Sequence, residues 1–242
     1  MKALVTGGSG YFGSLLIEKL IEAGWEVGSL DINSVSDLQK NVSFHEKDIR
    51  YTEGLNSCLD GYDVLFHNVA QVPLAKDKKL FNSVNIDGTV NVLEACISKK
   101  VKKIIYTSSS AVFGVPKKNP ITEYSIPNPQ EDYGKAKYVA EKKCEEFISK
   151  GLEVIIIRPR TILGHGRLGI FQILFEWIRS GYNIPVLGNG ENIYQFVHAN
   201  DLADAIILSA KQNIRSGTYN CGADRYGSMR EVLGFLCKYA DT

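Results

Sequence analysis

Six short runs of β-branched and other apolar residues recur along the chain, separated by longer segments of helical periodicity. Because these runs are apolar on both faces, they indicate parallel strands buried between two layers of helices. The predicted strands are Ala3–Thr6, Val27–Asp31, Ser43–Asp48, Val64–His67, Lys103–Ser108 and Val154–Arg158. The predicted helices between them are Gly13–Ala23, Thr52–Cys58, Leu80–Ser98 and Asp132–Ser149. The fold class is therefore α/β, with a doubly wound parallel sheet.

The first predicted strand runs directly into a glycine-rich turn. Gly7, Gly10 and Gly13 follow a strand and open a helix, which is the setting in which this spacing binds a pyrophosphate. The first glycine permits the tight turn, the second lets a phosphate approach the backbone, and the third lets the helix pack closely on the strand. Amides at the helix N-terminus then face the phosphate charge. The turn predicts a dinucleotide site in a Rossmann-like sheet, the alternative being a plain helix-capping turn.

A carboxylate ends the second predicted strand. Asp31 follows the glycine turn by about twenty residues, where a carboxylate binds the ribose 2′-hydroxyl of a dinucleotide. The residues Ile32, Asn33 and Ser34 come next, and none is an Arg or Lys that could receive a 2′-phosphate. NAD is therefore favoured over NADP as the cofactor.

The character of the chain changes after Pro159. A loop punctuated by Gly164, Gly166 and Gly169 leads to an amphipathic helix near Phe171–Ser180 and a turn-rich stretch at Pro185–Asn192. We predict that residues 1–160 form the NAD-binding domain with the catalytic residues. Residues 161–242 then contribute the segments of a small substrate lobe, interleaved with the end of the sheet in one compact unit.

The bulk composition narrows the classes of partner. With 28 Lys and Arg against 27 Asp and Glu, the net charge of +1 gives no electrostatic reason to expect nucleic acid or an anionic membrane. The five cysteines are widely spaced, which is typical of reduced thiols, and no His, Cys, Asp or Glu spacing predicts a metal site. No apolar run approaches the roughly 20 residues of a membrane helix. We expect a cytoplasmic protein.

A tyrosine and a lysine lie one helical turn apart on the predicted helix Asp132–Ser149. An ammonium group near a phenol favours the phenolate and lowers the pKa of the phenol. Tyr133 and Lys137 can therefore form a general base that takes a proton from a substrate alcohol while a hydride leaves its carbon.

A second pair with the same spacing, Tyr138 and Lys142, is separated from the first by helical geometry. At about 100° per residue, Tyr133 and Lys137 continue the apolar stripe of Ala140, Cys144 and Phe147. Tyr138 and Lys142 fall on the opposite, charged face. The first pair is therefore the predicted site.

Hydroxyl groups gather where the strand Lys103–Ser108 ends. Residues 107–114 read TSSSAVFG, and side chains at the carboxyl end of a parallel strand lie where ligands bind in this architecture. One of these hydroxyls can hydrogen-bond both a substrate oxygen and the tyrosine. The alternative is a serine-rich turn that only caps the strand.

Taken together, these motifs resemble the extended short-chain dehydrogenase/reductase superfamily, in its NAD-dependent epimerase/dehydratase branch. The resemblance runs through essentially the whole chain and includes the segments at residues 6–13, 48–50, 67–70, 85–95, 107–114, 133–137, 158–159 and 196–201. It implies that Ser109 is the catalytic hydroxyl, beside Tyr133 and Lys137. His67 and His198 are expected to be structural.

The resemblance also implies binding residues. The expected cofactor contacts are Gly7, Gly10, Tyr11, Phe12, Gly13, Asp31, Ile32, Asp48, Ile49, Asn68, Val69, Ala70, Asn85, Thr107, Tyr133, Lys137, Pro159 and Arg160. The expected substrate contacts are Ser109, Ser110, Thr161, Arg167 and Tyr194. A homodimer through the helices near Leu80–Ser98 and Asp132–Ser149 follows only from the resemblance.

Two features depart from the family pattern. Sugar-nucleotide epimerases of this kind carry an Arg-Asp pair just before the Phe-Val-His run, and here Tyr194 and Gln195 stand there. Without that guanidinium the site loses a preferred phosphate partner, for which Arg160, Arg167 or Arg179 could substitute. Extended members also continue for several tens of residues beyond the position of Thr242. The lobe is therefore incomplete unless this is a naturally short member.

Three functions remain open. The first is an NAD-dependent epimerase or dehydratase that acts on a nucleotide-linked sugar through a transient hydride transfer and a keto intermediate. The second is a sterol or other alcohol dehydrogenase of the same superfamily, which the apolar stretch from Ile170 to Trp177 favours. The third is a non-catalytic NAD-binding sensor, which the presence of Ser109, Tyr133 and Lys137 disfavours.

Overall fold

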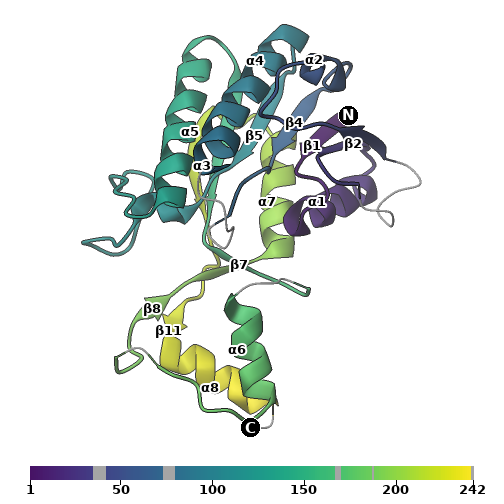
Figure 1. The fold of residues 1–242 in the computed structure, drawn as a ribbon. Helices are drawn as coiled ribbons and strands as arrows, with labels where there is room; N and C mark the ends of the chain where they lie inside the picture. The colour runs from purple at the N-terminus through teal and green to yellow at the C-terminus, as the bar shows by residue number, and fades with distance from the viewer. Residues whose placement is uncertain (35–41, 73–79, 167–169, 187, 241–242) are drawn as a thin grey trace.

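A computed structural model of the chain describes residues 1–34, 42–72, 80–166, 170–186 and 188–240. Its centre is a seven-stranded parallel sheet in the order β10-β6-β5-β4-β1-β2-β3 (Figure 1). The strands are β1 (Lys2–Thr6), β2 (Glu26–Asp31), β3 (Ser43–Glu46), β4 (Val64–His67), β5 (Lys103–Thr107), β6 (Glu153–Pro159) and β10 (Gly217–Cys221). This arrangement confirms the predicted fold class.

Helices cover both faces of the sheet. One face is packed by α1 (Tyr11–Glu22) and α7 (Ala199–Lys211), and the other by α2 (Leu55–Cys58), α4 (Thr89–Lys99) and α5 (Asp132–Ser149) (Figure 1). Alternate residues of the central strands enter the two cores. On β5, Ile104 and Tyr106 belong to the core beneath α4 and α5, while Ile105 belongs to the core beneath α1 and α7.

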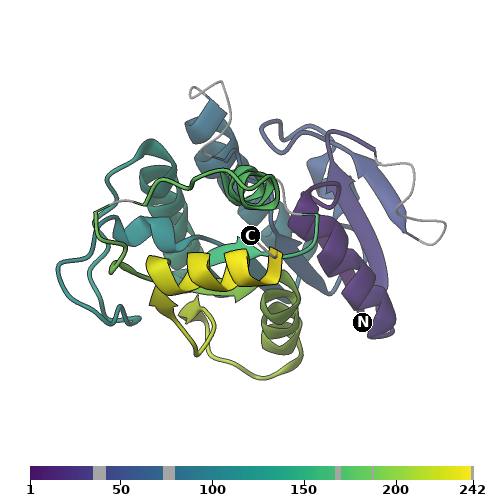
Figure 2. The ribbon, with the colours of Figure 1, turned by 90° about the horizontal axis from the view of Figure 1, so that it is seen from below.

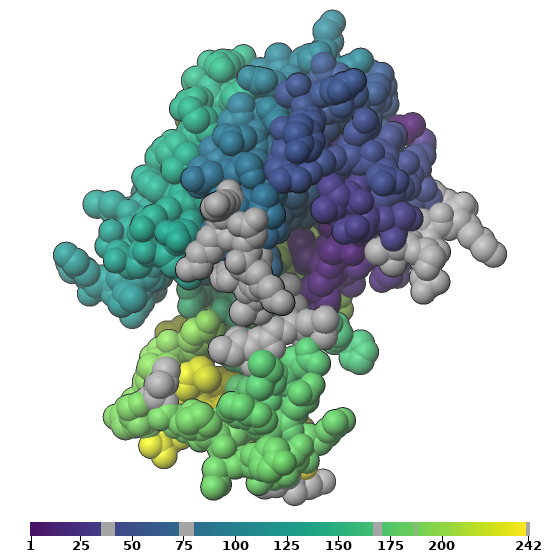
Figure 3. All heavy atoms as spheres, viewed as in Figure 1, coloured from purple at the N-terminus to yellow at the C-terminus, as the bar shows by residue number. Residues whose placement is uncertain are grey.

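A smaller lobe lies beyond the carboxyl ends of the strands. There β7 (Thr161–Leu163) pairs in parallel with β9 (Phe196–His198), and β8 (Ile193–Tyr194) pairs antiparallel with β11 (Gly227–Ser228). The helices α6 (Ile170–Arg179) and α8 (Met229–Ala240) pack together at the far end of the lobe (Figures 1 and 2). In the space-filling view the lobe lies below the part of the molecule that contains the sheet (Figure 3).

The structure refines several predicted elements. The predicted helix Leu80–Ser98 is interrupted, because α3 (Leu80–Asn82) leads into a π-helix, η1 (Ser83–Gly88), before α4 begins. The first helix starts two residues earlier than predicted, at Tyr11, and the third strand ends at Glu46 instead of Asp48. Within the described residues, no helix is long and apolar enough to cross a membrane.

Candidate active site

The predicted site residues gather at the carboxyl edge of the sheet, where the strand order reverses. Chain connections run from β1 to β2 and β3 on one side and from β4 to β5 and β6 on the other, so β1 and β4 are the strands at the reversal. Thr6 at the end of β1 lies opposite His67 at the end of β4. A crevice at such a reversal is the usual ligand site of doubly wound sheets.

The glycine turn at the end of β1 has the close packing that its sequence predicts. Gly7 has a φ of +72°, which side-chain-bearing residues rarely adopt. A Cβ on Gly13 would lie 2.0 Å from the carbonyl oxygen of Gly7. The helix α1 starts after Gly10 without a side-chain cap or an acidic first turn. Its first amides, those of Tyr11 and Phe12 among them, are therefore oriented to receive an anion.

Asp31 lies beside this turn and ties it to the second strand. Its carboxylate accepts hydrogen bonds from the backbone N–H groups of Ser9 (3.1 Å), Ile32 (2.8 Å) and Asn33 (3.3 Å). These three backbone donors fix the orientation of the carboxylate. The side chain is therefore held as a hydrogen-bond acceptor next to the phosphate turn, as ribose binding requires.

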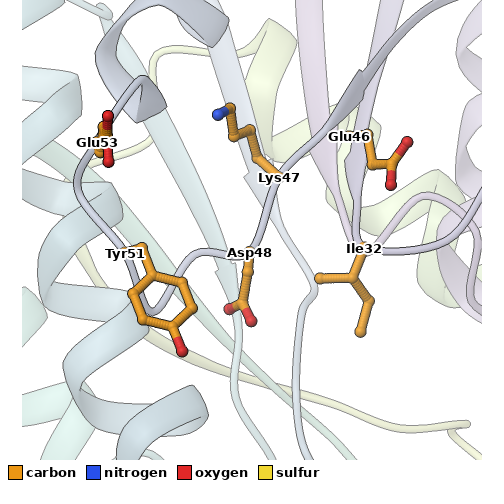
Figure 4. A pocket seen from close by; sticks show the side chains of 6 residues that line it. All are labelled: Ile32, Glu46, Lys47, Asp48, Tyr51 and Glu53. Atoms are coloured by element: carbon orange, nitrogen blue, oxygen red, sulfur yellow. The ribbon is translucent and has the colours of Figure 1, made fainter.

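An open pocket of about 390 Å³ continues from Ile32 along the ends of β2 and β3. Asp48 lies between Ile32 and Tyr51 in this pocket, with Glu46, Lys47 and Glu53 around it (Figure 4). Arg50 donates to both oxygens of Asp48 and holds the pKa of that carboxyl below its usual range. The neighbouring Ile49 is buried beneath Gly88 instead of lining the pocket.

The segment after β4 holds a donor suited to a ligand. Thr107 donates its hydroxyl to Oδ1 of Asn68 at 2.5 Å, whereas the buried Nδ2 of Asn68 has no hydrogen-bond partner within the part of the chain that is described. Leaving such a group unpaired is costly. Asn85 exchanges two hydrogen bonds with the backbone of Gln71, so it holds the loop that contains Val69 and Ala70.

Lys137 projects from α5 to the end of β5 and is almost fully buried. Its Nζ donates to the carbonyl oxygen of Thr107 at 2.8 Å and to the hydroxyl of Tyr106 at 3.3 Å. Burial disfavours the ammonium and lowers the pKa of Lys137 from 10.5 to about 8. The amine can therefore change its charge near neutral pH.

Tyr133 lies one turn earlier on α5, and Phe81 of α3 contacts its ring edge to face at 6.5 Å between centroids. The next residue, Gly134, packs so closely on the serine turn that a Cβ there would lie 2.5 Å from the carbonyl oxygen of Ala111. Ser109 begins that turn, and its Oγ accepts from the N–H of Ala111 at 3.1 Å. The start of α5 and the Ser109–Ala111 turn, which includes the half-buried Ser110, therefore lie against each other.

The predicted helical stripe is correct, but it contains a charged residue that the prediction omitted. Glu141 is fully buried on α5, and both of its oxygens accept from Arg158 of β6, at 2.8 and 2.7 Å. Ser108 donates to the same carboxylate at 2.5 Å. This ion pair joins α5, β5 and β6 directly behind Ser109. Only its position four residues after Lys137, on the buried face, could have indicated it from sequence.

Three buried side chains surround His67, as expected for a structural role. Its Nδ1 lies 2.7 Å from Oγ1 of Thr6 and its Nε2 lies 3.0 Å from Oγ1 of Thr89, while its ring stacks on Tyr106. Burial lowers the pKa of His67 to about 3, so the imidazole is neutral at neutral pH. His198 caps α7 by accepting from the N–H of Asn200.

On the lobe side, Tyr194 takes the position where the family pattern has an arginine. Its hydroxyl lies 2.7 Å from Oγ1 of Thr161, and the guanidinium of Arg160 lies over its ring at 5.6 Å from the centroid. Phe171 and Phe196 complete an aromatic cluster around it. Gln195 donates to the carbonyl of Ala223 and so holds β10 to the lobe. Pro159 ends β6 as a buried residue, and Arg167 lies outside the described residues.

The donor groups of this edge fit a dinucleotide. Amides of a helix start face one end, and the Asp31 carboxylate and an open pocket lie at the other. Asn68, whose amide nitrogen is unpaired among the described residues, accepts from Thr107, and the carbonyl of Thr107 accepts from Lys137. Among the described residues, no group of three or more His, Cys, Asp or Glu side chains could hold a metal ion. Fold and site together define a dinucleotide-binding protein of the doubly wound class.

The chain belongs to the NAD-dependent epimerase/dehydratase family, whose model matches residues 3–222. This membership confirms the resemblance inferred from the sequence, NAD as the cofactor, and the assignment to a family of enzymes.

Three relatives illustrate the range of the family. The chain is 50% identical to an uncharacterized protein of Sinorhizobium fredii, over 99% of this chain and 61% of that protein. It is 32% identical to human sterol-4-alpha-carboxylate 3-dehydrogenase, decarboxylating, over 90% of this chain and 59% of that protein. The chain thus spans about three fifths of the length of these relatives. The solved UDP-glucose 4-epimerase of Thermotoga maritima with UDP-glucose matches with a TM-score of 0.89 and 29% identity, covering 100% of this chain and 83% of that one.

Proposed function

We propose that the chain forms the cofactor-binding and catalytic part of an NAD-dependent epimerase or dehydratase that acts on a nucleotide-linked sugar. The observation that carries the proposal is the packing of Lys137 and the start of α5 onto the end of β5, next to the glycine turn. The similarity to an epimerase solved with UDP-glucose supports the substrate class.

The chemistry follows from three side chains. Tyr133 takes the proton of a substrate hydroxyl on its phenolic oxygen, and the Lys137 ammonium favours the phenolate that does so. Ser109 already accepts a bond from Ala111, so its hydroxyl hydrogen can be donated to the substrate oxygen. NAD, when bound, supplies the acceptor for the hydride that leaves the same carbon. The resulting ketone would then be reduced again by the same hydride, either directly or after loss of water, so that the turnover has no net redox change.

Arg160 supports binding of an anionic substrate. Its guanidinium is stacked on Tyr194 in the lobe, and a planar guanidinium in a fixed orientation is well suited to a phosphate. We propose that Arg160 contacts the substrate diphosphate, in addition to or instead of the cofactor contact expected from the family pattern. Ser110, Thr161, Arg167 and Tyr194 remain proposed substrate contacts.

A second candidate, an NAD-dependent dehydrogenase of sterols or other apolar alcohols, is favoured by one observation. The rings of Phe171, Tyr194 and Phe196 form a cluster beside the proposed substrate site, with centroids 4.9 to 6.4 Å apart. Such a cluster suits an apolar ligand, and one relative of this chain is a sterol dehydrogenase. In this case NAD is released as NADH after each turnover.

The two candidates differ in ligand and in net redox change. The test titrates the full-length protein with UDP- and dTDP-sugars and with sterols, and follows binding by calorimetry and NADH by absorbance. We expect nucleotide-sugar binding and turnover without NADH accumulation. Tyr133→Phe should lower turnover by about 10²- to 10⁴-fold and preserve binding, whereas the matched variant Tyr138→Phe should change neither.

Other outcomes decide against the proposal. NADH accumulation with a sterol, without nucleotide-sugar binding, supports the second candidate. Turnover that is unchanged in Tyr133→Phe contradicts both candidates.

A further inference from the structure

A buried polar cluster lies behind Lys137, and the proposed chemistry assigns no role to it. It consists of Thr6 on β1, His67 on β4, Thr89 on α4 and Tyr106 on β5, all buried. Tyr106 is among the largest fully buried side chains of the described chain. A tyrosine hydroxyl at such depth needs hydrogen-bond partners, and the identity of those partners indicates what the cluster does.

One partner of Tyr106 is the Lys137 amine. Nζ of Lys137 donates to the Tyr106 hydroxyl at 3.3 Å and lies 4.7 Å from the centroid of its ring. The carbonyl of Thr107 accepts from the same amine at 2.8 Å. These two bonds use two of the three N–H groups of the ammonium, and both acceptors belong to the end of β5.

Tyr106 is itself held in place. Its ring stacks on His67 with centroids 5.6 Å apart and an interplanar angle of 28°. Its hydroxyl lies beside Thr89, whose own hydroxyl donates to the carbonyl of Asn85. Because Thr89 donates there, it accepts from Nε2–H of His67, and Nδ1 of His67 accepts from Thr6. A single tautomer of His67, with its hydrogen on Nε2, therefore satisfies both ring nitrogens.

We propose that Tyr106 is a positioning residue for Lys137. Its hydroxyl, together with the Thr107 carbonyl, fixes the amine at the end of β5 and favours the charged form that Tyr133 requires. The significance for turnover rests on the proposed function, whereas the contact itself does not.

Among the groups that face the amine, the Glu141 carboxylate favours the ammonium through its charge, and the remaining support comes from neutral acceptors. Glu141 and Cys144 lie near it on α5, Tyr133 on the preceding turn, His67 on β4 and Tyr106 on β5. The Glu141 carboxylate is bound by Arg158 and Ser108. Burial raises the pKa of Tyr106 well above 10 and keeps His67 neutral, so neither adds a charge. The Tyr106 hydroxyl therefore stabilises the ammonium as a dipole.

The contact can be tested without turnover, in protein that carries ¹³C at the Cε of lysine. The Lys137 signal is assigned by its loss in Lys137→Arg, and its midpoint is measured by NMR across pH 6 to 11. Tyr106→Phe, which keeps the ring and removes the oxygen, should lower the midpoint by about one pH unit, or about 1.4 kcal/mol. The matched control Tyr138→Phe, next to the exposed Lys142, should leave it unchanged.

A second measurement uses the unaltered protein and does not depend on the variant folding. With ¹³C at the Cζ of tyrosine, the Tyr106 signal should move with the same midpoint as that of Lys137. An unchanged Lys137 midpoint in folded Tyr106→Phe overturns the proposal. A Tyr106 chemical shift that stays constant while Lys137 titrates overturns it as well.

Kinetic measurements test the effect on turnover separately from the contact between Tyr106 and Lys137. Loss of the ammonium removes support for the phenolate, so the basic limb of the kcat profile should shift to lower pH in Tyr106→Phe, with the Kd for NAD unchanged. A shifted NMR midpoint with no turnover in wild type contradicts only the proposed function.

Discussion

The sheet and the lobe hold their functional side chains in different ways. At the carboxyl edge of the sheet, Lys137 and Glu141 are 2% and 0% exposed, and each is bonded by groups from another element. In the lobe, Phe175 and Trp177 on α6 remain 40% exposed, and Phe235 on α8 remains 63% exposed. Lys137 and Glu141 on the same helix are thus fixed by burial, whereas the surface near the proposed substrate site is lightly packed. A lobe of this kind can change its specificity at little cost to the fold.

The largest expected contrast lies between two glycines. Gly13→Ala places a Cβ 2.0 Å from a backbone oxygen, so α1 must shift and the phosphate turn with it. We expect a loss of at least about 4 kcal/mol of unfolding free energy and no measurable NAD binding. In the lobe, Gly234→Ala on α8 meets nothing within 4 Å and should stabilise the helix by up to about 1 kcal/mol. Urea unfolding and calorimetry measure both, and NAD binding retained in Gly13→Ala would contradict the assignment of the turn.

The second contrast compares two ion pairs. Glu141→Gln leaves Arg158 buried without its counter-charge, so we expect a loss of about 3 to 5 kcal/mol in urea unfolding. Glu191→Gln removes a lobe pair with Arg230 in which both side chains are more than 60% exposed, and it should not change the midpoint measurably. Equal effects of the two substitutions would mean that the buried pair contributes no more to the free energy of unfolding than the exposed pair does.

The third contrast concerns pH. The pKa of His67 is about 3 in the folded chain and 6.5 in the unfolded one, so the unfolded state binds a proton first as pH falls. His67 therefore costs stability progressively below pH 6.5, by about 2 to 3 kcal/mol at pH 4.5. His67→Gln should lower stability at pH 7 but flatten this acid dependence, as followed by circular dichroism. The exposed lobe residue His165, replaced by Gln, serves as the control and should keep the wild-type slope.

The smallest expected effect concerns the lobe arginine. Arg160→Ala should weaken UDP binding about tenfold, or about 1.4 kcal/mol. Unchanged NAD binding in the same variant would assign the guanidinium to the substrate alone, and weakened NAD binding would assign it to both ligands. Arg215→Ala, an exposed arginine just before the amino end of β10 and so at the opposite edge of the sheet, is the matched control and should have no effect. Calorimetry at two salt concentrations measures both. Equal weakening by the two variants would indicate a diffuse charge effect instead of a defined contact.

The parts of the fold that sequence could predict are those with strong patterns. The first six strands of the sheet, and α5 with its buried stripe, follow from apolar runs and from the 3.6-residue period. The strand β10, with the sequence GTYNC, was missed because it is half-buried and polar, and its pairing depends on β6. The bend at η1 was missed because a π-helical turn leaves little trace in the period of apolar residues.

The residues of the candidate site also fall into those that sequence predicts and those that it does not. Spacing along one helix or turn predicts the glycines, Tyr133, Lys137 and Ser109, because the partners are near in sequence. Tyr106 lies 31 residues from Lys137, and their contact arises only when β5 and α5 are packed together. Glu141 is a residue whose charge predicts exposure, and the bonds from Arg158 of β6 and from Ser108 make its burial tolerable.

The strand β10 also bears on how the chain is made. It completes the sheet against β6, and Val154 and Ser216 at their paired starts are 62 residues apart in sequence. Between them the chain passes through most of the lobe. During synthesis from the N-terminus, the edge of β6 stays unpaired until that whole segment has been synthesised and β10 can pair with it. Substitutions in the lobe can therefore alter the yield of correctly assembled protein, even where they leave the finished structure unchanged.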